Sequence, residues 1–165
     1  MKFIKNKKVI FLFIAIIIIV ILSIFAFNLY NGKKEEEKVI NLDFETLAPK
    51  IENMMDIENT RMENVDKTVL KDKFGIDENC VLEVIGKLPI LNVKSNMYIV
   101  VKVTPDQKEN VKQKFEEYGL NMEKEWENYL SDEYSKVKER KIGIVGDYVY
   151  FIVSSNKDMI VDLLK

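Results

Sequence analysis

Carboxylates are the most numerous side chains in this chain that could do chemistry. Seven of them fall into two groups, one at residues 43–45 and one along residues 116–127. Oxygen-rich groups bind hard cations such as Ca²⁺, but a binding loop sets its ligands at fixed spacings, and no such spacing is present. Most of the seven fall on the charged face of a predicted helix, so we predict a solvated face and no metal site. They are Asp43, Glu45, Glu116, Glu117, Glu123, Glu125 and Glu127.

A pair of carboxylates can also cleave glycosidic bonds, and Asp132 and Glu133 are adjacent. Adjacent positions on a helix do not face each other, so this pair does not converge on one substrate. Histidine is absent, which removes the commonest general base and the usual Ser–His and Cys–His pairs. The single Cys80 adjoins an apolar run and is typical of a small buried hydrophobe. We expect no enzyme, no cofactor and no metal, with a wall-active hydrolase as the least favoured alternative.

Aromatic side chains could form a binding surface, because their rings stack on sugars and on apolar groups of peptides. Trp126 and Tyr129 recur on the apolar face of a predicted long helix, which favours a core position for both. Tyr148 and Tyr150 share one face of a strand whose other face is also apolar, so this strand is either covered twice or presents its tyrosines to a partner. The candidate interaction surface consists of Tyr148, Tyr150, Tyr134 and Trp126.

The longest apolar run covers residues 9–27 and contains no charged side chain. A helix needs roughly 20 apolar residues to cross a bilayer. Four lysines and no acidic residue precede the run, which predicts a cytoplasmic N-terminus and an extracellular C-terminal domain. A cleaved signal peptide fits less well, because the apolar core is long and its exit is bulky. The predicted single-pass signal anchor uses Val9, Ile10, Phe11, Leu12, Phe13, Ile14, Ile17, Val20, Ile21, Leu22, Phe25 and Phe27.

Charge is distributed unevenly along the chain. The whole chain has 25 Lys and Arg against 27 Asp and Glu, and its first 38 residues contain seven Lys and three Glu, so the remainder has a net charge of −6. Such a domain is poorly suited to nucleic acid. We divide the chain into a cytoplasmic basic tail (1–8), a transmembrane helix (9–30), a charged tether (31–38) and an extracytoplasmic domain (39–165).

The apolar spacing in the last segment predicts an α+β fold. We expect a four-stranded, mostly antiparallel sheet with the long helix packed on one face, preceded by the N-terminal transmembrane helix. Residues 59–64 and 86–95 are predicted loops, and Gly146 with Asp147 predicts a tight hairpin turn. Helices are predicted at 39–58, 65–74, 104–129, 131–138 and 156–164, and strands at 81–87, 97–103, 140–145 and 148–153.

Several short motifs recur in a characteristic order. They are Phe74-Gly75-Ile76-Asp77, Asn92-Val93-Lys94, Tyr129-Leu130 followed by Glu133-Tyr134, and Gly146-Asp147-Tyr148-Val149. On these, the chain from about Val69 to Leu164 resembles a family of unknown function from Gram-positive bacteria of the clostridial kind. The resemblance implies a small extracytoplasmic domain, carried by lipoproteins or by N-terminally anchored proteins. This chain lacks the lipoprotein Cys, and the resemblance implies no catalytic residues.

These observations favour a membrane-anchored protein-interaction module of the cell envelope. Its expected partners are the lipid bilayer and another envelope or membrane protein, and not nucleic acid. The alternative is a module that binds or senses a small ligand or a cell-wall fragment. The sequence leaves the oligomeric state open.

Overall fold

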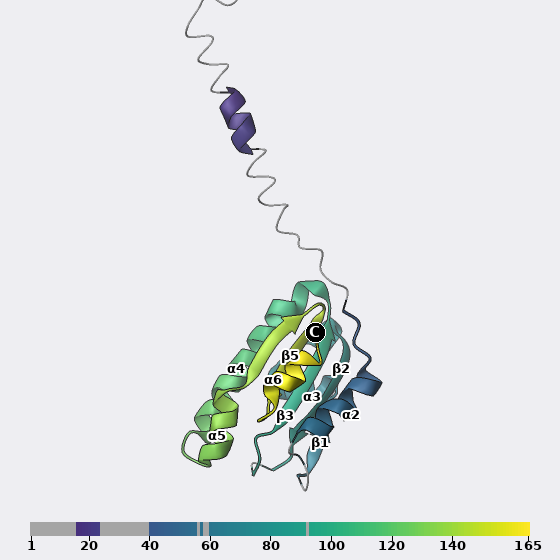
Figure 1. The fold of residues 1–165 in the computed structure, drawn as a ribbon, viewed down its shortest axis with the longest axis vertical. Coiled ribbons are helices and arrows are strands. Elements are labelled where there is room, and N and C mark those ends of the chain that lie inside the picture. The colour runs from purple at the N-terminus through teal and green to yellow at the C-terminus, as the bar shows by residue number, and fades with distance from the viewer. Residues whose placement is uncertain (1–15, 24–39, 56, 58–59, 92) are drawn as a thin grey trace, which may run out of the picture. The chain divides into compact units, whose positions relative to one another are not determined.

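The structure, a computed structural model, describes residues 16–23 and 40–165, apart from residues 56, 58–59 and 92. The chain divides into two units, Met1–Lys38 and Val39–Lys165. The second unit, shown as the ribbon that ends at the C-terminus in Figure 1, contains the whole sheet and both hydrophobic clusters. It therefore holds its own core, which is what a domain needs to fold by itself.

One five-stranded antiparallel sheet organises this unit. Its spatial order is β1-β2-β3-β5-β4, so β3 is central and β1 and β4 are the two edges. The prediction of an α+β class is confirmed, but the prediction of four strands is wrong, because β1 adds a fifth. The strands are β1 (Met62–Asn64), β2 (Val81–Pro89), β3 (Met97–Val103), β4 (Lys141–Val145) and β5 (Tyr148–Val153).

The extra strand lies where the sequence predicts a loop. β1 has three residues, which are too few to show the apolar–polar alternation that marks a strand. It pairs with the far end of β2, with Met62 opposite Pro89 and Asn64 opposite Lys87. β2 therefore runs two residues beyond its predicted end. Pairing with a distant segment, rather than local pattern, makes residues 62–64 extended.

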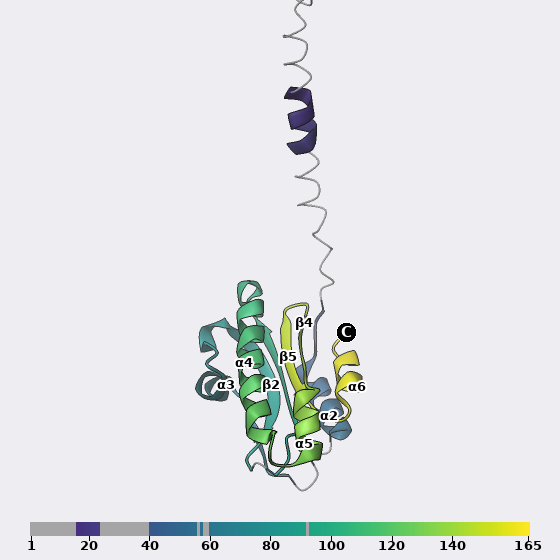
Figure 2. The ribbon, with the colours of Figure 1, turned by 90° about the vertical axis from the view of Figure 1, so that its left-hand side faces the viewer.

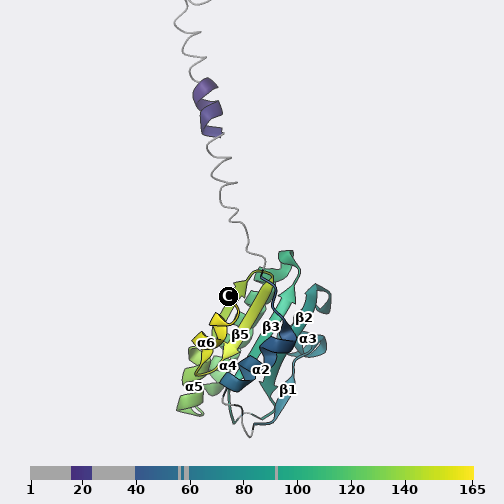
Figure 3. The ribbon, with the colours of Figure 1, turned by 45° about the vertical axis from the view of Figure 1, so that its right-hand side comes forward.

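Helices cover both faces of the sheet (Figures 2 and 3). Successive side chains of a strand point to opposite faces, so Ile99 and Val101 of β3 join one cluster while Tyr98 and Val100 join the other. The first cluster includes residues of α3, α4 and α5, and the second includes residues of α2 and α6. The helices are α2 (Phe44–Met54), α3 (Lys67–Phe74), α4 (Lys108–Trp126), α5 (Ser131–Lys138) and α6 (Lys157–Asp162).

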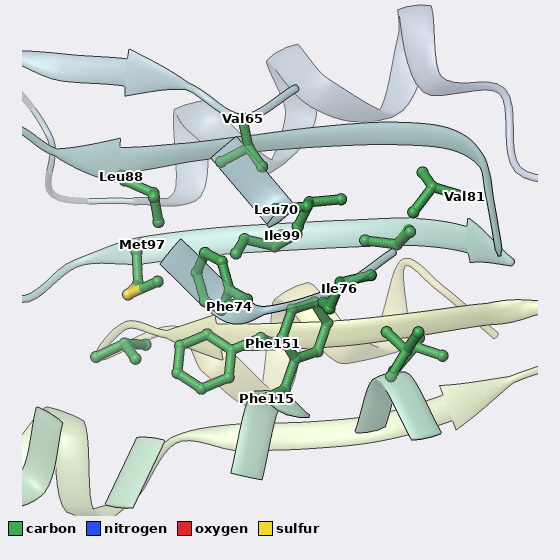
Figure 4. Packing of buried hydrophobic residues seen from close by; sticks show 14 of the residues in the cluster. Val65, Leu70, Phe74, Ile76, Val81, Leu88, Met97, Ile99, Phe115 and Phe151 are labelled. Atoms are coloured by element: carbon green, nitrogen blue, oxygen red, sulfur yellow. The ribbon is translucent and has the colours of Figure 1, made fainter. Parts of the chain in front are cut away.

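Aromatic rings fill the larger cluster. Phe115 of α4 lies 5.5 Å from Phe74 of α3 and 5.7 Å from Phe151 of β5, measured between ring centroids. Figure 4 shows these three rings together beside Leu70 and Ile99. Each buried aromatic ring removes about 150–250 Å² from water, so this group supplies much of the packing between α4 and the sheet.

Residues 40–43 cross the β4–β5 turn before α2 begins. The Leu42 N–H donates to the Tyr148 hydroxyl at 3.0 Å, and that hydroxyl donates to Asn41 Oδ1 at 3.4 Å. Ile40 lies against Gly146, which has φ 54°, the sign that a two-residue hairpin turn requires at its first central position. We call residues 40–43 the entry segment.

Within the described residues, the predicted transmembrane helix is not found. No described helix is both long enough and apolar enough to cross a membrane. Residues 16–23 form a helix in the described part of the chain. Ile17, Val20, Ile21 and Leu22 lie in it, and the other predicted anchor positions, from Val9 to Ile14 with Phe25 and Phe27, lie outside the described residues. The extracellular location stays a prediction.

Candidate functional site

Exposed apolar side chains gather at one end of the sheet. Residues 90–96 join β2 to β3, residues 127–130 join α4 to α5, and Figures 1 and 2 show both connections at the end of the sheet away from the β4–β5 turn. Five large side chains there are each between 42% and 60% exposed. A group of exposed apolar side chains marks a contact surface more often than a single exposed leucine does. The group, called the apolar end below, consists of Ile90, Leu91, Val93, Tyr129 and Leu130.

A polar pocket of about 580 Å³ adjoins the apolar end. Its walls come from the β2–β3 connection, α5, the residue that follows α5, the segment between β5 and α6, and the first residue of α6. Three lysines and three carboxylates line it, so its walls have no net charge. The lining residues are Lys94, Asp132, Glu133, Ser135, Lys136, Glu139, Ser154, Ser155 and Lys157.

Glu133 is the buried charge of this pocket, with 7% of its surface exposed. One carboxylate oxygen accepts from the Ser95 N–H at 2.8 Å and from the Ser95 hydroxyl at 2.7 Å. The other accepts from Lys136 Nζ at 2.8 Å, and Lys94 Nζ lies 4.0 Å away. Burial by itself raises the pKa of Glu133, but the hydrogen bonds from Lys136 and Ser95 outweigh it and hold the pKa below its usual range. Glu133 thus fixes α5 to the start of β3.

Several polar groups of the pocket are already paired within the chain. Two of its three carboxylates are held in ion pairs, since Glu139 accepts from Lys157 at 2.8 Å and Glu133 accepts from Lys136. The Ser135 hydroxyl donates to the Ser131 carbonyl, and the Ser154 hydroxyl accepts from the Asn156 N–H. Among the described residues, no group of three His, Cys, Asp or Glu side chains could hold a metal ion. Ammonium, carboxylate and hydroxyl groups side by side suit a ligand that bears both charges.

A second polar group lies on the other face of the sheet. Glu52 of α2 accepts from Lys87 Nζ at 2.8 Å and from the Tyr98 hydroxyl at 2.9 Å. Burial, followed by the hydrogen bond and the charge of Glu52, raises the pKa of Tyr98 well above its usual range, so this hydroxyl stays a donor. These contacts join α2 to β2 and β3. The hollow beside them, about 190 Å³, is small for a ligand site.

The predicted interaction residues are spread through the molecule. Trp126 is 4% exposed and Tyr148 is fully buried, while Tyr134 and Tyr150 are half-buried. Tyr134 packs against the α4 side of the sheet and Tyr150 against the α2 side, so the four rings do not share one face.

Two further sequence expectations can be compared with the structure. Cys80 is buried, and burial together with nearby Asp77 raises the pKa of its thiol, which keeps it protonated and unreactive. Tyr129 is 60% exposed because α4 ends at Trp126, one turn earlier than its apolar pattern suggests.

Sequence reasoning did not predict the site that the structure presents. Ser95 and Glu133 are 38 positions apart, and nothing in either local pattern indicates that they meet. Ile90, Leu91 and Val93 stand in a predicted loop, and three large apolar residues in a loop are the one signal that could have indicated the apolar end.

Comparison with known proteins gives one family. A family model described as a domain of unknown function (DUF4358) matches residues 55–154. No curated protein matches the chain, and no solved structure matches it. The matched segment contains the whole sheet and the residues of the apolar end.

Proposed function

The chain belongs to the DUF4358 family, whose function is unknown. We propose, from the geometry of the domain, that it acts by binding another protein through the apolar end. The observation that carries this proposal is that two separate connections at the same end of the sheet both present exposed apolar side chains. Protein interfaces have an apolar centre and a polar rim, and here the charged pocket supplies one side of such a rim. The proposal includes no reaction. The envelope location of the partner stays a prediction from the sequence resemblance.

The polypeptide that presents these side chains is held in place. Glu133 binds Ser95, which closely follows the exposed Leu91 and Val93. Glu133 itself lies in the first turn of α5, three residues after Leu130. One buried carboxylate therefore links both connections of the apolar end. A fixed arrangement loses less conformational entropy when a partner binds, which favours affinity.

Site-specific photo-cross-linking in the native host tests the proposal. A photoreactive amino acid at Leu91 should give one defined protein adduct, whereas the same amino acid at Leu82 should not. Leu82 is a matched control because it is 51% exposed, close to the 54% of Leu91, but lies at the start of β2, at the opposite end of that strand. The captured protein, once purified, should bind residues 39–165 and lose affinity when Leu91 and Leu130 are changed to Ser.

The outcome that contradicts the proposal is equally specific. Equal adducts at Leu91 and Leu82, or unchanged affinity in the Leu91→Ser, Leu130→Ser variant, would show that the apolar end is not the contact surface. Both substitutions are at exposed positions, so their effect on stability should stay within about 0.5 kcal/mol. Loss of binding would then report the contact and not unfolding.

The polar pocket favours a second candidate function, the binding of a small ligand that carries both positive and negative groups. Its volume lies within the range of about 300–1,000 Å³ that is typical of ligand sites, but such sites are lined mainly by apolar side chains. Saturable binding of wall fragments to residues 39–165, lost in Lys157→Ala and kept in Leu91→Ser, would favour this function over the first.

A further inference from the structure

The polar pocket beside the apolar end is positively charged in its most buried part. Its least exposed lining residues are Glu133, Lys136, Ser154 and Lys157, and we call these four the floor. The side chains of Lys136 and Lys157 are only 16% and 14% exposed, and Ser154 is 1% exposed. Two lysines and one glutamate give the floor a net charge of +1.

The floor also has hydrogen-bond donors to spare. An ammonium group has three donors, and Lys136 and Lys157 each donate to one carboxylate. The Ser154 hydroxyl accepts from a backbone N–H at 3.1 Å, and among the described residues no group accepts its proton. Both oxygens of Glu133, by contrast, already accept hydrogen bonds. The group that the floor can still bind is therefore a charged acceptor such as a carboxylate.

The rim of the pocket has the opposite charge. Its exposed ionised side chains are Lys94, Asp132 and Glu139, which together have a net charge of −1. Glu139 accepts from a floor lysine, but Asp132 accepts only from a serine hydroxyl at 3.4 Å and forms no ion pair with any residue that the structure describes. Asp132 is thus the rim group best able to bind a cation.

We propose that the pocket binds a small zwitterion such as an amino acid or a short peptide, with its carboxylate on the floor and its ammonium group at Asp132. Asp132 and Lys136 are four positions apart in α5 and so are neighbours on one face of that helix, where one small molecule can contact both. The walls are neutral overall, so a zwitterion leaves the pocket neutral, whereas phosphate brings uncompensated negative charge close to the rim. This binding rests on the second candidate function and adds the chemical class and the orientation of the ligand.

An NMR titration with unblocked glycine peptides tests the proposal. Glycine, diglycine and triglycine carry the two charges at increasing separation and have no side chain. At least one of them, added up to about 50 mM so that a millimolar Kd is measurable, should saturably shift the amide signals of Asp132, Ser154 and Lys157 in isotope-labelled residues 39–165. The N-acetylated and the C-terminally amidated forms of that ligand should each bind about tenfold more weakly or worse, because each leaves a charged group of the pocket without its partner.

Two variants assign the charges of the ligand to the floor and to the rim. Asp132→Asn should remove the preference for a free ammonium group, so that the ligand and its acetylated form bind equally. Lys157→Met should weaken the binding of both forms by the same factor, because both keep the carboxylate. Asp132 has no ion partner among the described residues, and Glu139, the partner of Lys157, has a side chain that is 64% exposed, so both variants should stay folded.

The possible results separate this proposal from the functions proposed above. The Leu91→Ser, Leu130→Ser variant alters only the apolar end and should bind the zwitterion as the parent does. Equal binding of the ligand and its two blocked forms, or tighter binding of inorganic phosphate, would overturn the zwitterion proposal and keep the pocket as a ligand site. No saturable shift with any of the three ligands would overturn the proposal and the second candidate function together, while protein binding at the apolar end is judged by cross-linking.

Discussion

β1 and β4 are the two edge strands of the sheet, and they differ in length, in regularity and in what lies beside them. β1 has three residues and covers only the last part of β2. The uncovered part of β2 contains a register shift between Val81 and Glu83, and Glu83 forms an ion pair with Lys102. Short strands, bulges and charges are the means by which proteins protect sheet edges.

β4 has none of these means except Lys141. It keeps an unbroken register with β5 over five residues, from Lys141 opposite Ile152 to Val145 opposite Tyr148. Unprotected edges invite pairing with other chains. The difference teaches that the two edges of one sheet are protected to different extents: the β1 side has a short strand, a register shift and a charge, whereas β4 has a charge alone.

The largest expected effect is a difference in stability between alanine variants of two glycines, Gly86 in β2 beside the β1 edge and Gly143 in the edge strand β4. A methyl group at Gly86 would lie 2.6 Å from the Tyr98 carbonyl oxygen, which the sheet holds fixed. At Gly143 the methyl would meet the end of the Tyr150 ring, a side chain that can move. Gly86→Ala should cost about 3 kcal/mol of unfolding free energy and Gly143→Ala about 1 kcal/mol. Urea unfolding of residues 39–165 measures both, and equal midpoints would contradict this reason for the two glycines.

The next effect compares two glutamates. Glu133 holds α5, which leads into β4, whereas Glu63 lies in β1 and pairs with Lys73 at 2.6 Å with both side chains well exposed. Glu133→Gln should cost about 2–3 kcal/mol, because a buried hydrogen-bonded charge is lost and Lys136 loses its partner. Glu63→Gln should cost less than about 0.5 kcal/mol. A loss at Glu63 as large as that at Glu133 would show that the β1 edge depends on its surface ion pair.

The effect of Glu133→Gln on stability should also depend on pH. The pKa of Glu133 is lower in the folded domain than in the unfolded chain, so its carboxylate stabilises the fold above the unfolded pKa of about 4.3. That contribution is lost as the pH falls through the lowered folded pKa. The stability gap between the parent and Glu133→Gln should therefore be constant above about pH 5 and should shrink below it. A gap that is unchanged in acid would mean that charge is not the source of the effect.

The smallest expected effect is local. The N–H groups of Ile142 and Ile144 point outward from β4, as do those of Met62 and Asn64 from β1, since the Val65 N–H donates to Gly86 and sets the alternation there. Amide hydrogen exchange in residues 39–165 should be faster at residues 142 and 144 than at residues 143 and 145, whose N–H groups face β5. Equal exchange rates at these four residues would contradict the alternation of backbone direction along β4.

Local patterns were sufficient for most of the elements but not for their partners. The alternation of residues 97–103 and the turn at Gly146 predicted β3 and the β4–β5 hairpin, and the α4 pattern placed Phe115 and Trp126 inward. β1 was not predicted, because three residues are too few to show a strand's alternation of apolar and polar side chains. The burial of Glu133 was not predicted, because it depends on hydrogen bonds from Ser95, which is distant in the sequence and is brought close only by the tertiary fold. The apolar run at 9–27 predicted a membrane span that the described residues do not contain.

The entry segment also decides how the domain responds to force. Residues 40–43 reach the sheet at the β4–β5 turn through a few contacts, chiefly the Leu42 N–H on the Tyr148 hydroxyl and Ile40 against Gly146. Tension applied to the chain before residue 40 would meet these contacts one after another, as in peeling, and each is worth about 1 kcal/mol. The segment would detach before the load reached the strands. Under tension the entry segment would therefore detach first and lengthen the chain in front of the domain, while the sheet and both of its edges stay folded.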